Sequence, residues 1–460
     1  MLRALGVLVV LAILGCTVAF VVAGRGAPPG LTIAKPERVV GQTGTLEVTA
    51  TAPNASFTAL TITLEQNGKT IPLYSNAAAQ QAEVTRVDRN QLRISRSIGK
   101  QSLPDLQSGP ARIVVTATRP SFLNLRQLTS SATKDFQVRL ERPRIAVMST
   151  HHYVNHGGSE MVVYRATPSD VQSGVRVGNV EYPGFPLPVG GASGANNELK
   201  AAFFALSWDQ DLNTPIGAFA RDEAGNESKA TFVDNVFEKP QRKSRIELDD
   251  RFLNRVVPEI AEHAPELKMP PPSEGSDMLP AFLKENGELR RINADQIAAL
   301  AKKTSPTRLW EGPFVQLGNS KVEASFADHR TYIYKGKEVD QQVHLGFDLA
   351  VTEHVPVVAA NAGIVVNADW LGIYGNCVVI DHGMGVQSLY GHLMSFDVKV
   401  GDKVTRGQQI GRSDSTGLAG GDHLHFTMLV GGHMVNPVEW WDPHWIADRV
   451  DRKLKEAGVQ

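Results

Sequence analysis

The chain has 460 residues, more than one hydrophobic core usually serves, so about two to four domains are expected. Hydrophobic residues make up 42% and charged residues 21%, which is an ordinary globular composition. The formal net charge of -1 leaves no basic excess of the kind that nucleic-acid binding requires, so we expect no nucleic-acid partner.

The amino-terminal segment 4–24 is apolar and uncharged, and Arg3 is the only charged residue before it. About 20 such residues span a bilayer as a helix, and the run is longer than the roughly 7 to 15 apolar residues of a cleaved signal. The segment therefore predicts a signal anchor, or transmembrane helix, in residues 1–26. We expect a single-pass protein of the inner (cytoplasmic) membrane, with the bulk of the chain in the periplasm or another extracytoplasmic space. Cleavage after Ala23 and lipidation at Cys16 are the two alternatives.

The two cysteines, Cys16 and Cys377, are not expected to form a disulfide, because Cys16 lies in the predicted membrane segment. Cys377 lies in an apolar strand pattern, and we interpret it as a small buried hydrophobic residue. Export without disulfides is compatible with a bacterial envelope protein.

Residues 27–142 alternate apolar and polar side chains, as Leu46 and Val48 illustrate. A period of two with abundant Thr and Val predicts the antiparallel strands of a β-sandwich. A second β-rich stretch fills residues 143–238. Its segment 217–232 has a strand, an Asp-Glu-Ala-Gly-Asn turn and a returning strand, and it resembles the last hairpin of bacterial immunoglobulin-like domains. We therefore expect a mainly β protein with two β-sandwich-like domains before its carboxy-terminal half.

Residues 239–309 are richer in charge and have helical spacing. Phe252, Val256 and Ile260 fall on one face of a helix, and Asn293 is a candidate N-cap for a second, short helix. We interpret this region as a helical connector.

Residues 310–445 are again β-rich, and residues 446–460 are expected to form a helical tail. Three phrases in the β-rich part, HLGFD, YGHL and GDHLHF, contain the following candidate site residues: His344, Asp348, His392, His423 and His425. Residues i and i+2 of a strand point to the same face, so His423 and His425 project together. Catalytic zinc takes three protein ligands and a water, and His344, Asp348 and one histidine of the pair would complete such a set.

These phrases, in this order, resemble the successive motifs of the lysostaphin/LytM-type zinc metallopeptidases, which cleave peptide cross-links of peptidoglycan. The likeness covers roughly Pro313 to Trp440 and includes PVVAANAGIVV and GNCVVIDHG. It implies an antiparallel β peptidase domain in which one Zn²⁺ per chain is held by three ligands: His344, Asp348 and His425. It also implies that His392 and His423 are catalytic.

Two features depart from the family pattern. Gly421-Asp422 stands where a Gly-Pro is usual, and the segment 325–342 is longer than the common short Phe-Gly-x-Arg form. These departures affect the expected shape of the substrate groove rather than the metal site.

The resemblance implies a zinc-dependent endopeptidase of peptidoglycan, in which a zinc-bound water attacks the amide and His392 and His423 assist. The chain has no HExxH glutamate, so a histidine base is expected, and which histidine serves as base stays open. One alternative is a non-catalytic envelope protein whose peptidase-like domain binds or activates another cell-wall hydrolase. Another is a carbohydrate-binding adhesin, which the lack of an aromatic stripe in residues 31–237 disfavours.

The expected partners are peptidoglycan, the membrane through residues 4–24, and a regulatory envelope protein. The long region before the peptidase domain further suggests that this region covers the groove and holds the enzyme latent.

The remaining histidines are given structural interpretations. His382 is expected to lie in a turn between strands, and the histidines of the segment 151–156 are expected in a surface loop. Three more lie outside the motifs: His354, His433 and His444.

Overall fold

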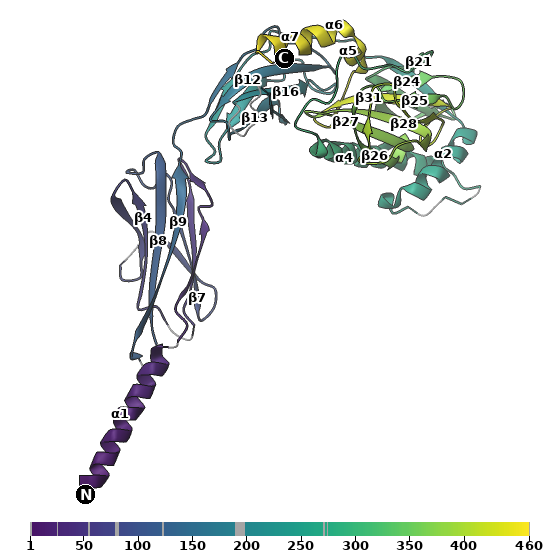
Figure 1. The fold of residues 1–460 in the computed structure, drawn as a ribbon. Helices are drawn as coiled ribbons and strands as arrows, with labels where there is room; N and C mark the ends of the chain where they lie inside the picture. The colour runs from purple at the N-terminus through teal and green to yellow at the C-terminus, as the bar shows by residue number, and fades with distance from the viewer. Residues whose placement is uncertain are drawn as a thin grey trace. The chain divides into compact units, whose positions relative to one another are not determined.

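The structure is a computed structural model of the chain, and it describes residues 2–24, 26–53, 56–78, 82–121, 124–188, 198–269, 272–273 and 275–459. The described part is mainly β, as the sequence predicts (Figure 1). It divides into two compact units. The first comprises Met1–Pro143 and Arg221–Glu227, and the second comprises Arg144–Ala220 and Ser228–Gln460.

The first unit contains a β-sandwich. One sheet has the order β1 (Gly30–Lys35), β3 (Thr45–Thr51), β7 (Gln91–Ser97), β6 (Glu83–Arg86), and the other has the order β2 (Val39–Val40), β9 (Gln127–Val138), β8 (Gly109–Pro120), β4 (Ala59–Gln66), β5 (Lys69–Ser75). Leu46 and Val48 of β3 share a fully buried core with Ile62 of β4 and Val115 of β8. The period-two pattern therefore forms the strands that it predicts.

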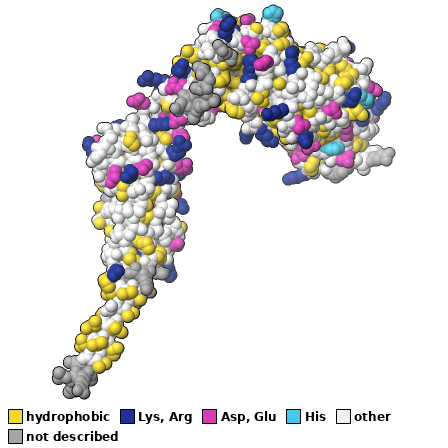
Figure 2. Space-filling view, viewed as in Figure 1, with side chains coloured by type: hydrophobic (Ala, Val, Ile, Leu, Met, Phe, Trp, Pro, Cys, Tyr) yellow, Lys and Arg dark blue, Asp and Glu magenta, His cyan; other side chains and the backbone are white. Residues whose placement is uncertain are grey.

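The amino-terminal segment forms a helix, α1 (Leu2–Gly24). Figure 2 shows hydrophobic side chains along it, and Val7 and Leu8 are 59% and 64% exposed. Within the described residues, no helix reaches the length and hydropathy of a membrane span. The membrane anchor therefore stays a prediction.

The second unit begins with a β domain of two four-stranded sheets. The first has the order β10 (Arg144–Val147), β12 (Ser159–Thr167), β16 (Leu199–Ala205), β15 (Phe185–Pro186), and the second has the order β14 (Val180–Pro183), β13 (Gln172–Val177), β17 (Ile216–Arg221), β18 (Glu227–Ala230). Strands β17 and β18 are neighbours, which confirms the predicted hairpin. A likeness to immunoglobulin domains stays a prediction.

The connector region contains a strand and several helices. In chain order they are β20 (Lys243–Leu248), α2 (Asp250–His263), η2 (Pro265–Leu267), α3 (Leu279–Lys284), η3 (Glu285–Leu289), α4 (Arg290–Leu300) and η4 (Ala301–Lys303). Asp249 caps α2 by accepting a hydrogen bond from the Phe252 backbone N–H, and Val256 and Ile260 are buried as their spacing predicts.

The prediction that Asn293 is an N-cap is wrong. Helix α4 continues directly from η3, so Asn293 lies inside the helix. Its side chain is buried, and its Oδ1 accepts a hydrogen bond of 3.0 Å from the Ile373 backbone N–H. A tertiary contact, rather than a helix start, accounts for this asparagine.

The carboxy-terminal domain is built on a ten-stranded antiparallel sheet (Figure 1). Its main path is β21 (Lys321–Ala324), β24 (Phe347–Ala350), β31 (His423–Val430), β28 (Val386–Phe396), β27 (Asn376–Gly383), β26 (Gly363–Trp370), β29 (Lys403–Val404), with β25 (Pro356–Val358), β30 (Gln409–Ser413) and β32 (His433–Val435) paired at the side. A second sheet joins β20 in parallel to β22 (Asp328–Tyr334), which pairs with β23 (Lys337–His344).

The two faces of the large sheet pack against different parts of the chain. On one face, Val378, Tyr390 and Met428 share a hydrophobic cluster with residues of the β domain and with Trp310 and Trp440. On the other face, four sheet residues pack in a cluster with helices α2, α3 and α4. These residues are Cys377, Val379, Leu389 and Leu429. Both faces are therefore buried, in keeping with the apolar run of β27.

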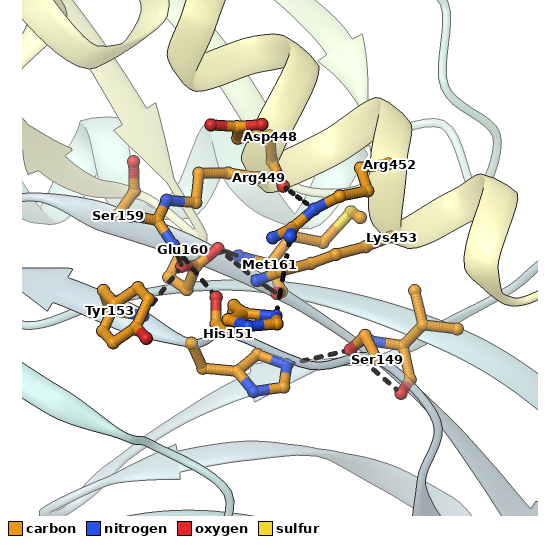
Figure 3. Close-up of polar contacts among 12 residues, drawn as sticks. Ser149, His151, Tyr153, Ser159, Glu160, Met161, Asp448, Arg449, Arg452 and Lys453 are labelled. Atoms are coloured by element: carbon orange, nitrogen blue, oxygen red, sulfur yellow. Dashed lines mark hydrogen bonds and ion pairs between the residues drawn. The ribbon is translucent and has the colours of Figure 1, made fainter.

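Helices at the carboxy terminus begin before the predicted start at residue 446. They are α5 (Pro437–Trp441), α6 (Pro443–Ile446), η6 (Ala447–Asp451) and α7 (Arg452–Glu456), and together they are called the helical tail. A buried ion pair joins it to β12: Lys453 Nζ lies 2.7 Å from Glu160 Oε1, and it also donates to the Met161 carbonyl at 2.8 Å (Figure 3). Arg449 lies 3.6 Å from the other Glu160 oxygen. The tail is thus held to the β domain by charged groups that are removed from solvent.

Candidate metal centre

Three side chains from neighbouring strands of the carboxy-terminal domain converge on one point. His344 ends β23, and Asp348 of β24 is directly opposite His425 of β31 in the antiparallel register. His344 Nε2 lies 2.9 Å from Asp348 Oδ1 and 3.1 Å from His425 Nδ1, and the last two atoms are 3.1 Å apart. One potential ligand atom from each of the three residues therefore lies in a single tight group, although His425 is about 80 positions from the other two.

Nearby residues orient these side chains so that their atoms could share a cation. His344 Nδ1 donates to the Ser325 carbonyl at 3.2 Å, which leaves the lone pair of Nε2 directed at the group. Gly346 lies between two of the ligands, and a Cβ there would come within 2.5 Å of the His425 ring. The glycine of HLGFD therefore makes room for the imidazole of His425.

The chemistry of this group fits zinc. Two imidazoles and one carboxylate are a ligand set of catalytic zinc sites. Burial alone would raise the pKa of Asp348, but the facing imidazoles of His344, His423 and His425 hold it well below its usual value. The carboxylate is therefore ionised and available as a ligand.

His392 and His423 lie beside this group, and backbone carbonyls hold both. His392 Nδ1 donates to the Thr416 carbonyl at 2.7 Å, and His423 Nδ1 donates to the Gly421 carbonyl at 2.8 Å. The two rings have centroids 4.8 Å apart, and His423 Nε2 lies 3.4 Å from Asp348 Oδ1. Each histidine is thus fixed through Nδ1 and presents Nε2 away from the backbone.

The environments of these two histidines differ. Burial, together with the nearby His423 and His425, holds the pKa of His392 well below its usual value. Burial would also lower the pKa of His423, but its hydrogen bond to Asp348 and the charge of that carboxylate raise it. His392 also has a backbone φ of 60°, which is uncommon outside glycine and often marks functional positions.

Sequence reasoning missed Arg330 on β22. Its Nη2 lies 2.8 Å from Asp348 Oδ2, the oxygen that does not face the imidazoles, and its Nε lies 3.5 Å from Asp328. Ser244 of β20 in turn donates to Asp328 at 2.6 Å. The only sequence signal was the unusual segment 325–342, because an arginine on a strand otherwise looks like a surface residue.

The predicted structural histidines lie outside the ligand group. The predicted turn position of His382 is wrong, because the residue lies inside β27. It is buried and hydrogen-bonds the Ala362 carbonyl and the Ser388 hydroxyl, each at 2.7 Å, as a structural histidine does. The surface prediction is wrong for His152, which is 2% exposed and bonded to Ser149. Its ring packs edge-on against Phe232, with the centroids 4.9 Å apart.

The departure at Asp422 has a structural role. Its Oδ2 accepts a hydrogen bond of 2.8 Å from the His354 backbone N–H, which ties two loops beside the site together. His354, Asp414 and Asp422 form a second group with potential ligand atoms, but the His354 side chain is 46% exposed.

Comparisons with known proteins agree with this geometry. The family described as peptidase family M23 matches residues 342–437. DD-carboxypeptidase/endopeptidase Mpg of Neisseria meningitidis is 40% identical over 97 residues, which is 21% of this chain and 22% of that protein. Peptidoglycan DD-endopeptidase ShyA of Vibrio cholerae is 31% identical over 161 residues, which is 35% of this chain and 34% of that protein. Murein hydrolase activator EnvC of Escherichia coli is 41% identical over 95 residues, which is 21% of this chain and 23% of that protein.

The chain thus spans about a fifth to a third of the length of these relatives. The matched residues coincide with the strands that bring the three ligand atoms together. The segment from residue 342 to residue 437 is a peptidase M23 domain of the LytM type.

Proposed function

We propose that this chain is a zinc-dependent endopeptidase that hydrolyses peptide cross-links of peptidoglycan. The observation that supports this most is the convergence of His344, Asp348 and His425 within hydrogen-bond distance, with His392 and His423 beside them. The names of two relatives, Mpg and ShyA, describe endopeptidases, and that of ShyA specifies peptidoglycan.

In this proposal, the two further histidines divide the proton transfers. Zinc, when bound to the three ligands, supplies a Lewis acid and lowers the pKa of water toward about 7. His392 donates through Nδ1, so its neutral ring has a free lone pair on Nε2 that can accept a proton from the attacking water. The same nitrogen then returns a proton to the leaving amine. His423, whose Nδ1–H is bound to the Gly421 carbonyl, can donate from Nε2 as an imidazolium, the form that Asp348 favours, to the carbonyl oxygen on which negative charge develops.

We also propose that the enzyme acts outside the cytoplasm, with residues 4–24 as its anchor in the inner membrane. The uncharged run of that segment supports the idea. Cell fractionation tests it, because release of the intact chain by a salt wash of membranes would contradict an anchor.

The function is tested with residues 25–460 and three variants, by measuring zinc content and the release of soluble fragments from purified peptidoglycan. We expect the unaltered protein to hold about one zinc and to release fragments. His344→Ala loses zinc and activity. His392→Ala keeps zinc but is about 100- to 1000-fold slower, because a group that acts in the transition state is removed.

His444→Ala is the matched control, since the His444 side chain is 93% exposed and lies outside the ligand group. It should keep both zinc and activity. A zinc-loaded, folded protein that releases no fragments would contradict the enzyme proposal.

The likeness to EnvC favours one alternative, a domain that activates another cell-wall hydrolase. The same experiment separates the two. An activator releases no fragments by itself but accelerates a second hydrolase that is added to the assay. Its His344→Ala variant should accelerate that hydrolase equally well.

A further inference from the structure

Helix α2 of the connector region lies on the face of the sheet that contains the candidate site. Residues i and i+2 of β31 share a face, so His423, His425 and Leu429 point to the same side. Leu429 belongs to the hydrophobic cluster that includes Val256 and Ile260 of α2. The peptidase sheet and α2 therefore share a core on the side of the histidines.

Two side chains of α2 hold the segment 414–421, which runs from the end of β30 to the start of β31. Arg255 Nη1 donates to the Ser415 carbonyl at 3.2 Å, and its Nη2 donates to the Ala419 carbonyl. Glu259, one turn later, faces the Gly417 backbone N–H, which lowers the pKa of its carboxyl against the rise that burial causes. The Arg255 guanidinium also lies over the Phe252 ring, 5.8 Å from its centroid.

The same segment supplies the carbonyls that fix the two non-ligand histidines. The Thr416 carbonyl accepts from His392 Nδ1, and the Gly421 carbonyl accepts from His423 Nδ1. Alternate backbone groups of one short segment thus face in two directions. Those of Ser415 and Ala419 accept from Arg255 of α2, that of Gly417 faces Glu259, and that of Thr416 binds a site histidine.

We infer that Arg255 and Glu259 are positioning residues for the proposed reaction. They hold segment 414–421 so that its carbonyls keep His392 and His423 protonated on Nδ1 and oriented with Nε2 toward the ligand group. Both residues lie outside the matched range 342–437, so the working catalytic unit includes α2. The inference rests on the proposed endopeptidase function, since a positioning residue needs a reaction to serve.

The test measures kcat and KM of zinc-loaded residues 25–460 on a soluble cross-linked peptide. We expect Arg255→Met and Glu259→Ala to lower kcat about 10- to 100-fold, with KM changed less than about twofold and zinc content unchanged, because small misplacements of a catalytic group have effects of this size. Glu259→Gln keeps an oxygen acceptor for the Gly417 N–H and should stay near the unaltered rate. Arg251→Met is the control, since Arg251 is exposed one turn earlier on α2.

A second readout reports the histidines directly. In long-range ¹H–¹⁵N spectra of the imidazole rings, the unaltered protein should show His392 as the Nδ1–H form, and Arg255→Met should lose that single form. A purely structural helix contact would lower stability but leave this signature in the folded protein. Arg255→Lys keeps the charge and one donor, and its intermediate kcat would support the inference even if Arg255→Met folds poorly.

The two proposals fail in distinguishable ways. If the unaltered, zinc-loaded protein does not cleave, the proposed function is wrong. If it cleaves and the Arg255 and Glu259 variants cleave equally well with unchanged imidazole spectra, the inference is wrong and the proposed function stands.

Discussion

At the scale of single residues, the two oxygens of Asp348 have separate tasks. Oδ1 faces the imidazoles of His344 and His425, whereas Oδ2 is held by Arg330 at 2.8 Å. A carboxylate that ligates a metal through one oxygen rotates freely unless the other oxygen is held. Arg330 therefore sets the direction in which Asp348 would offer Oδ1 to a metal ion.

Arg330→Met should weaken zinc binding about 10- to 100-fold, since the loss of outer contacts to metal ligands has effects of this size. Competition with a chromogenic chelator measures the change. Arg245→Met is the control, because Arg245 is exposed on β20 and makes only a 3.9 Å contact with Glu247 among the ion pairs described. Equal zinc affinity of Arg330→Met and the unaltered protein would show that Asp348 needs no such support.

At the scale of elements, the helical tail depends on charges buried against β12. Burial raises the pKa of Glu160 and lowers the pKa of Lys453 to about 8, so each group loses hydration that its partner replaces. The two side chains have no exposed surface. Removal of either residue would therefore leave the charge of the other buried without its partner.

Lys453→Met should lower the free energy of unfolding by about 3 to 5 kcal/mol, because it leaves the Glu160 carboxylate buried without its nearest partner. Urea unfolding measures the change. Arg452→Met is the matched control one residue away, since its contact with Glu456 is a partly exposed pair at 3.9 Å and is expected to matter by less than about 0.5 kcal/mol. Equal stability of the two variants would contradict the tight pairing.

At the scale of the whole molecule, the peptidase sheet is a middle layer of the second unit. One of its faces is covered by the β domain and the other by α2, α3 and α4. A fragment of residues 310–460 would expose both faces to water, and exposed apolar surface of this extent favours unfolding or aggregation.

We expect residues 144–460 to fold cooperatively and to match the specific activity of residues 25–460 on a soluble substrate. Residues 310–460 should be insoluble or unfolded. Thermal unfolding and peptide cleavage by the three proteins measure this. The same comparison tests latency, because a folded fragment of residues 310–460 with higher activity would show that the upstream region suppresses the enzyme.

How much the sequence predicts depends on the range of the interactions. The clustering of the candidate site residues followed from short phrases, because His423 and His425 are related by strand geometry and HLGFD places two candidate ligands around a glycine. The strands of residues 27–142 followed from their period of two. Local patterns of this kind are visible in sequence because one element determines them.

Contacts between distant elements were not visible in this way. Asn293 has the propensity of a helix cap, but a hydrogen bond to Ile373, 80 residues away, accounts for its position inside α4. Arg330 reads as an exposed strand residue until β22 and β24 are placed together. Nothing in the sequence of α2 connects Arg255 with a segment 160 residues further on.

The pairing of Glu160 with Lys453 also has a consequence for biosynthesis. The two residues are separated by 293 positions, so β12 leaves the ribosome long before its counter-charge exists. During that interval the Glu160 carboxylate is hydrated at the position that the helical tail later covers. The ion pair between β12 and the helical tail therefore forms only after residue 453 has been synthesised, when every residue of the histidine cluster, up to His425, already exists.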